Sequence, residues 1–275
     1  MTSGIAGIDH IIVAVRDLEA ARTGWVRLGF TPTPRGRHIG QGTANYCIMF
    51  GRDYLELLGF VERDEHAHRL ETFLAQREGP MSVAFAPERD AEATSASLAG
   101  RGLHPSAPRA LGRALELPEG DVTPRFSLLN LPPEETPALD CFVCGHLTPE
   151  LVRRREWLTH PNSVIGIKAV HLVADDPSTL AVAYRRLFGD DRVAMTARGL
   201  EVDTGRNRLI FTRPAMSGTD IPPPAITALE LRIDSRAASE AYLKSAGIVF
   251  MALPDGRLAI SPAEANGTSL LFSEN

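Results

Sequence analysis

The sequence predicts an α+β protein built from repeated βαβββ units. The first observation is a segment that occurs twice: residues 7–17 and 166–176 are aliphatic runs with one histidine each that end in acidic residues. Aliphatic and β-branched residues favour a buried strand and an acidic residue favours a helix N-terminus, so each copy predicts a strand followed by a helix. The second observation is a pair of turns, residues 51–56 and 205–210, that line up between the two halves.

Composition limits the class of protein. At 275 residues with 44% hydrophobic content, the chain is long enough for two domains or one duplicated domain. A net charge of -5, with lysine and arginine scattered, argues against nucleic acid as a partner. The sequence contains no apolar run near the ~20 residues of a membrane span, and its N-terminus lacks a basic region followed by an uninterrupted apolar segment, so we expect no membrane association and a cytoplasmic location. Three cysteines are too few for a disulfide framework.

The first half reads as two units in order. In the first unit, leucine, alanine and tryptophan recur at three- and four-residue spacings and predict a helix over residues 17–30. Residues 31–42 predict a loop or a short edge strand, and residues 43–50 and 54–58 predict a hairpin. For the second unit we expect an inserted helix (66–77), a strand (81–86), a helix (88–102), strands at 125–130 and 139–147, and a short helix (149–158) capped by Thr148.

The second half repeats this layout. The predicted elements are strand 170–174, helix 177–188, strands 199–203 and 208–212, strand 226–233, helix 236–247, and strands near Val249, Leu258 and Leu270. The four units therefore form two pairs. We place one domain over residues 1–165 and a second over residues 166–275.

Several segments resemble one superfamily. Residues 9–15 and 54–57, residues 36–38 with 42–45, and residues 146–152 with 157–162 resemble segments of the vicinal oxygen chelate superfamily, which includes glyoxalases, bleomycin-resistance proteins and extradiol dioxygenases. The glyoxalase-like branch is the most similar. The resemblance implies that each pair of units wraps into a half-open, barrel-like curved sheet.

The resemblance also implies a metal site in the first pair, with ligands from the first and last strand of each unit. The corresponding positions are His10 and Glu56 in the first unit and, in the second, Ser82, which is a poor ligand, and a last strand that offers Cys144 and His146. A set of His10, Glu56 and His146 suits a divalent ion, with Zn, Fe, Mn, Ni and Co not distinguished.

Each candidate also has a structural interpretation. His10 fits a buried strand position, and His146 fits a cap for the following segment. Cys141 and Cys144 are spaced as C-x-x-C, but a strand would direct them to opposite faces, which favours buried thiols over a zinc knuckle.

Polar residues near the expected barrel mouth suggest a substrate site. His38, Thr43 and Asn45 are placed to bind a substrate carbonyl or carboxylate, or to serve as ordinary loop residues. If Glu56 is not a ligand, it is the candidate catalytic base, and we expect burial to raise its pKa.

The second pair of units lacks a complete ligand set. His171 and Glu230 occupy first strands, but the last-strand positions fall near Ile210 and Leu271, which predicts a degenerate copy. Residues 268–272 contain no carboxylate, which argues against an extradiol dioxygenase.

Three functions remain open from the sequence. The leading prediction is a divalent-metal-dependent enzyme of lyase or isomerase type that acts on a small oxygenated carbonyl compound. The alternative is a metal-free protein that sequesters an apolar or aromatic small molecule in a pocket lined by residues such as Tyr46, Met49, Phe126 and Trp157. The third is a scaffold that forms a homodimer through exposed sheet edges.

Overall fold

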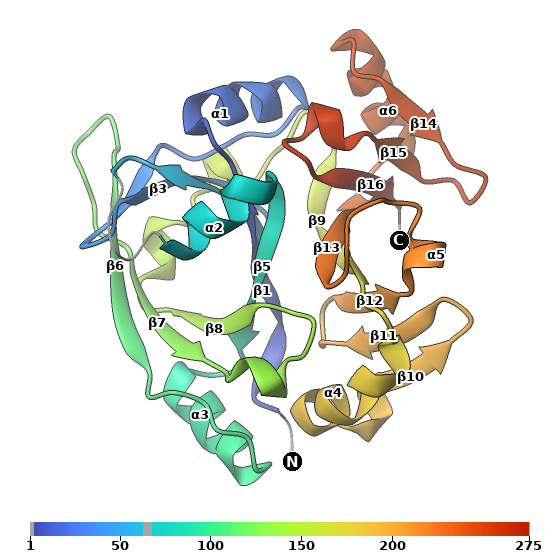
Figure 1. The fold of residues 1–275 in the computed structure, drawn as a ribbon. Helices are drawn as coiled ribbons and strands as arrows, with labels where there is room; N and C mark the ends of the chain where they lie inside the picture. Colours follow the sequence, from blue (N-terminus) through green and yellow to red (C-terminus); the bar gives the residue numbers. More distant parts are fainter. Residues whose placement is uncertain (1–2, 63–67, 275) are drawn as a thin grey trace.

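The computed structural model of the chain describes residues 3–62 and 68–274. Within these ranges the chain forms four βαβββ units in two pairs, which confirms the predicted α+β class (Figure 1). The first pair forms a closed barrel with the strand order β1-β4-β3-β2-β6-β7-β8-β5. Its strands are β1 (Ile5–Ala14), β2 (Gly36–His38), β3 (Thr43–Met49), β4 (Tyr54–Phe60), β5 (Gly79–Pro87), β6 (Arg109–Leu115), β7 (Arg125–Asn130) and β8 (Cys141–His146).

The second pair forms an open sheet with the order β10-β11-β12-β9-β13-β16-β15-β14. In Figure 1 it lies beside the barrel, with β9 and β13 nearest to the barrel strands β1 and β5. Its strands are β9 (Val164–Val173), β10 (Val193–Thr196), β11 (Gly199–Asp203), β12 (Arg208–Thr212), β13 (Ala225–Ile233), β14 (Phe250–Ala252), β15 (Leu258–Ile260) and β16 (Ser269–Ser273).

The barrel is closed where the sequence predicted a half-open one. The closing contact is the antiparallel pairing of β2 with β6, in which Gly36 lies opposite Leu115 and His38 opposite Arg113. No strand was predicted from the sequence at the position of β6, so the closing partner of β2 was missing. In the second sheet the corresponding strands β10 and β14 lie at the two ends of the order, and that sheet stays open.

Six α-helices connect the strands in the described part of the chain. Aspartates Asp17 and Asp90 cap α1 and α3 by accepting hydrogen bonds from backbone N–H groups, as their positions directly before the first helical residue favour. None of the helices in residues 3–62 and 68–274 has the length and apolar content of a membrane span. The helices are α1 (Leu18–Arg27), α2 (His68–Gln76), α3 (Ala91–Gly100), α4 (Ala181–Phe188), α5 (Pro214–Ser217) and α6 (Arg236–Ser245).

Two of the predicted helices differ from the structure in extent or in type. The inserted helix expected over residues 66–77 corresponds to α2, and residues 66–67 lie outside the described residues. The short helix expected over residues 149–158 was wrong: the segment forms two 3₁₀ turns, Pro149–Leu151 and Arg155–Trp157. A segment this short gains too few i→i+4 hydrogen bonds to offset helix nucleation, and the tighter turns replace the helix.

A buried polar joint connects the barrel to the open sheet. Asp53, in the β3–β4 turn, accepts a hydrogen bond from the backbone N–H of Ile167 at 2.9 Å, and the Asn207 amide nitrogen donates to it at 3.2 Å. The same amide nitrogen donates to the Ile167 carbonyl at 2.7 Å, while the Asn207 oxygen accepts from the backbone N–H of Ile8 at 2.8 Å. Burial, the largest influence, raises the pKa of Asp53 to about 6 despite these hydrogen bonds.

Candidate functional site

The barrel encloses a cavity of about 220 Å³. The parallel pairing of β1 with β4 places Ile12 beside Glu56 and His10 beside Tyr54, and all four side chains line the cavity. A large part of the wall is apolar, which keeps the local dielectric low and strengthens electrostatic interactions there. The predicted substrate-binding residues, which come from β2 and β3, also line it: His38, Thr43 and Asn45.

His10 is held by the residue before it. Its Nδ1 lies 2.8 Å from Asp9 Oδ2, and its ring stacks on Tyr54 with 4.4 Å between ring centroids. Consecutive strand residues normally point to opposite faces, but the register between β1 and β5 shifts between Ile8 and His10, and this irregularity lets Asp9 and His10 meet. Asp9 was not expected from the sequence to be a site residue, because strict alternation would have turned it away.

The ionised state of Asp9 determines which ring nitrogen of His10 carries the hydrogen of their shared bond. Burial acts to raise its pKa, but His146 and His10 outweigh burial and hold the pKa well below the ordinary range. Asp9 is therefore a carboxylate that only accepts, so His10 Nδ1 carries the hydrogen of that bond. A neutral His10 then presents the lone pair of its Nε2 to the cavity.

Several polar side chains converge on Glu56. His10 Nε2 lies 3.3 Å from Glu56 Oε2, and His38 Nε2 lies 3.6 Å from Glu56 Oε1. The Asn45 amide nitrogen donates to the same Oε1, and His38 Nδ1 pairs with Thr43 Oγ1 at 2.9 Å. The structure thus brings together the two residues predicted as ligands from the first unit and all three predicted substrate-binding residues.

The expected direction of the Glu56 pKa was wrong. Glu56 is buried, and burial by itself raises its pKa, but His10, His38, the Asn45 amide and Arg113 together lower the pKa below its ordinary value. These partners come from separate strands that only the folded barrel assembles. Glu56 is consequently ionised at neutral pH.

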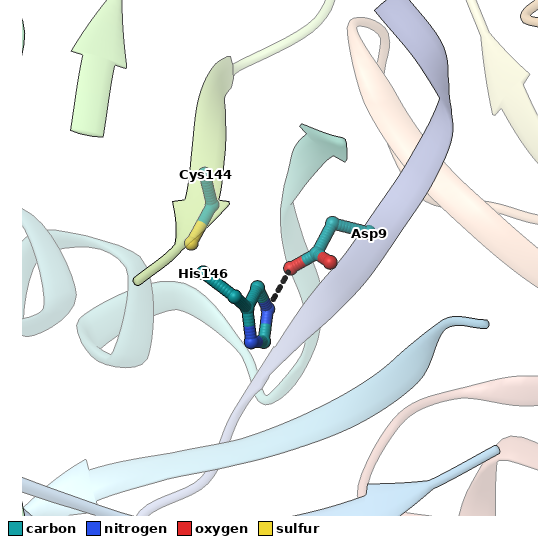
Figure 2. A group of neighbouring side chains, drawn as sticks. All are labelled: Asp9, Cys144 and His146. Carbon is teal, nitrogen blue, oxygen red and sulfur yellow. Dashed lines mark hydrogen bonds and ion pairs between the residues drawn. The ribbon is translucent and has the colours of Figure 1, made fainter. Parts of the chain in front are cut away.

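His146 does not face Glu56. Its Nε2 lies 3.0 Å from Asp9 Oδ2, and its buried Nδ1 has no hydrogen-bond partner among the described residues. Figure 2 shows the His146 ring joined to the Asp9 carboxylate, with the Cys144 thiol close to both, and one ligand atom from each of the three lies within 4.8 Å of the others. Cys144 lines the cavity and Cys141 lies on the opposite side of β8, both as buried free thiols, as expected.

Arg113 is a cavity residue that was not predicted from the sequence. It lies on β6, within a stretch crowded with proline and glycine where no strand was predicted. The sequence signal for this strand is that the large residues Leu111, Arg113 and Leu115 alternate with the small residues Gly112 and Ala114. Arg113 Nη1 donates to Asn45 Oδ1 at 3.3 Å and to Cys47 Sγ at 2.8 Å.

The pocket wall named for a sequestering protein was largely wrong. Of those residues only Phe126 lines the cavity. Tyr46 instead donates a hydrogen bond to Glu19 at 2.8 Å, while Met49 and Trp157 pack in a separate apolar cluster.

In the open sheet, His171 and Glu230 do meet. His171 Nε2 lies 3.2 Å from Glu230 Oε2, and Lys168, Arg257 and Ser273 also contact this carboxylate. Burial acts to raise the pKa of Glu230, but these partners lower it to about 2. Because the carboxylate is surrounded by cations and donors, this cluster is a satisfied ionic network.

Comparison with known families places this fold. The family model of the glyoxalase-like domain matches residues 8–188 of the chain. The chain belongs to the glyoxalase-like domain family. This confirms the resemblance to the glyoxalase-like branch of the vicinal oxygen chelate superfamily. Comparison with curated proteins gives no match.

Solved structures support the same fold. A hypothetical protein from Staphylococcus aureus is similar to this glyoxalase-like protein with a TM-score of 0.69 at 13% identity, covering 98% of this chain and 99% of that one. A triple mutant of 4-hydroxymandelate synthase from Streptomyces coelicolor gives a TM-score of 0.60 at 12% identity, covering 99% and 92%. At these identities the likeness concerns the fold alone.

Proposed function

We propose that this glyoxalase-like protein is a divalent-metal-dependent enzyme of lyase or isomerase type that acts on a small oxygenated carbonyl compound. The site is the cavity of the barrel, in the domain that we assign to residues 1–165. The domain assigned to residues 166–275 has a structural role, because its only comparable histidine and carboxylate, His171 and Glu230 among the described residues, are part of an ionic network.

One observation carries the proposal. With its Nδ1 hydrogen given to Asp9, a neutral His10 would present the lone pair of Nε2, which lies 3.3 Å from Glu56 Oε2, to that carboxylate. Two acceptors at this distance repel each other unless a cation lies between them, and that cation is either a proton on His10 or a metal ion.

The donor set fits a divalent ion in part. A histidine ligand that passes its other ring hydrogen to a carboxylate is a common arrangement at metal sites, and His10 with Asp9 has that geometry. His146 does not fit as placed, since its Nε2 bonds to Asp9. His38 is a better third ligand than His146, because its Nε2 faces Glu56. Burial also lowers the pKa of His38, which favours the neutral imidazole that a metal requires.

The side chains of the barrel account for the remaining requirements of the reaction. A bound divalent ion would polarise a substrate carbonyl. Thr43 and Asn45 present polar side-chain groups to the cavity, where they orient the substrate. The apolar part of the wall excludes water. Glu56 stays ionised at neutral pH, so it serves either as a ligand or, when free of the ion, as the acceptor of a proton beside the carbonyl.

Metal titration tests the proposal. Chelator-treated protein is titrated with Zn²⁺, Mn²⁺ and Co²⁺ by calorimetry, and the Co²⁺ absorption spectrum reports the ligand field. We expect one site per chain and a loss of at least about tenfold in affinity in His10→Ala and Glu56→Gln, with no change in the matched control His171→Ala. A protein that binds none of the three ions, or whose affinity ignores both barrel substitutions, contradicts the metal mechanism and favours a protonated His10 in a sequestering pocket.

A further inference from the structure

The cavity contains a buried cation that has no ion-pair partner among the described residues. Arg113 is 3% exposed and lines the cavity, and no described carboxylate lies within 4.0 Å of its guanidinium. Glu56 acts on this guanidinium electrostatically and is linked to it through Asn45, but a buried charge without a direct ion pair keeps a large part of its desolvation cost. The side chain is held in place, with Nη1 bonded to Asn45 and Cys47 and the guanidinium 5.5 Å from the centroid of the Phe126 ring.

The remaining donors of Arg113 are free of partners in the described part of the chain. Its buried Nε packs towards Gly36 and has no hydrogen-bond partner there, and the hydrogen bonds of the guanidinium all come from Nη1, which leaves Nη2 open. An arginine with one nitrogen anchored and another open is preorganised to bind an oxygen anion.

The charges along the cavity favour an anion as well. The described lining residues include Arg69, Arg109 and Arg113 as cations and Glu56 as the one carboxylate. Arg69 is paired with Asp140, whereas Arg109 is exposed beside the cavity. The lining therefore carries more positive than negative charge.

The size and polarity of the cavity narrow the class of anion. Most of the wall around the single buried guanidinium is apolar, with Ile12, Leu58, Met81 and Phe142 among its residues. A single buried guanidinium balances the one charge of a carboxylate, whereas a phosphate dianion would keep one charge without a buried counterion. An apolar group on the same molecule would fill the rest of the cavity.

We propose that Arg113 binds the carboxylate of the substrate, so that the natural ligand is a small carboxylic acid with an apolar group. The inference rests on the proposed function in taking the cavity as the substrate site. Asn45 bonds both Arg113 and Glu56, and it thereby sets the spacing between the carboxylate and the end of the cavity where His10 and Glu56 meet.

Binding of matched acid and ester probes tests the assignment. We would measure the dissociation constants of 4-methyl-2-oxopentanoate and its uncharged methyl ester by calorimetry, in chelator-treated protein and again with Zn²⁺ added. We expect the acid to bind roughly 10- to 100-fold more tightly than the ester in at least one of the two forms. In Arg113→Met the ratio should fall to about one while ester binding persists, and Arg125→Met, an exposed change of equal charge, should keep the ratio.

Four outcomes are informative. Equal binding of acid and ester in both forms of the wild-type protein overturns the assignment, and so does a preference that survives in Arg113→Met. Because Arg113 is buried, ester binding and a cooperative thermal transition are used to confirm that Arg113→Met is folded. If Arg113→Met does not fold, Arg113→Lys replaces it, and an undiminished acid preference in Arg113→Lys also counts against binding by the fixed guanidinium. An acid preference in a protein that binds no metal supports Arg113 and refutes only the metal mechanism.

Discussion

A single methyl group at Gly36 is expected to disturb the whole site. An ideal Cβ at this position of β2 would lie 2.5 Å from Asn45 Oδ1 and 2.6 Å from Arg113 Cδ. Both side chains are buried and hydrogen-bonded, Asn45 to Glu56 and Arg113 to Cys47, so neither can move without losing a partner. Overpacking and the loss of one hydrogen bond to a charged group together predict that Gly36→Ala destabilises the protein by roughly 2–5 kcal/mol.

The matched control is the same substitution where space is available. Gly24 lies inside α1, and a Cβ added there would meet no neighbouring atom within 4 Å, so alanine should stabilise the helix by about 0.5–1 kcal/mol. Urea unfolding followed by tryptophan fluorescence measures both variants. If Gly36→Ala were neutral, or stabilising like Gly24→Ala, the close packing of Asn45 and Arg113 against β2 would be refuted.

Further predictions concern the joint and the ionic network. The pKa of Asp53 rises from 3.8 in the unfolded chain to about 6 in the folded protein. Its contribution to stability is therefore present below pH 3.8, and about 3 kcal/mol is lost as the pH rises through 6. Asp53→Asn should remove this pH dependence from urea-unfolding profiles. Glu230 has a folded pKa of about 2 against 4.5, so the stability it gives above pH 4.5 is lost as the pH falls through 2, and Glu230→Gln flattens that limb. Asn207→Ala leaves the N–H of Ile8 and the carbonyl of Ile167 unpaired, which should cost about 2–5 kcal/mol in the same assay.

Controls for these predictions come from comparing each variant with the wild type at the same pH. Other carboxylates titrate in both windows, so the difference between the two profiles is the informative quantity. An Asp53→Asn profile parallel to that of the wild type between pH 4 and 7 would show that Asp53 is already ionised at little cost. A parallel Glu230→Gln profile below pH 4.5 would remove the role of its cationic neighbours, and an Asn207→Ala change below about 1 kcal/mol would indicate that water replaces the amide.

The repeat and the first pair of ligand candidates could be read from the sequence. His10 and Glu56 lie in strands whose parallel pairing follows from the βαβββ order, so their meeting depends on local patterns alone. The position of β6 could not be read with the same ease, because the surrounding proline and glycine obscure the alternation around Arg113. The lowered pKa of Glu56 was also beyond the sequence, since it depends on how several strands converge.

The position of His146 shows a different limit. Alternation correctly placed Cys144 and His146 near each other, but the direction of the imidazole is decided by Asp9, which reaches it from a register shift in β1. A shift of this kind leaves no mark on the hydrophobic pattern. The predicted boundary at residue 165 falls within β9, which begins at Val164, and it stays a prediction for the two domains.

The shared carboxylate of Asp9 has a consequence for how this protein is dissected by mutagenesis. Because His10 and His146 both depend on one acceptor, replacing either ring frees Asp9 to tighten on the other. Free-energy changes measured for the two single variants will then fail to sum to that of the double variant. A thermodynamic cycle across these three positions would measure that coupling directly, whereas an alanine scan read one residue at a time would assign the same energy twice.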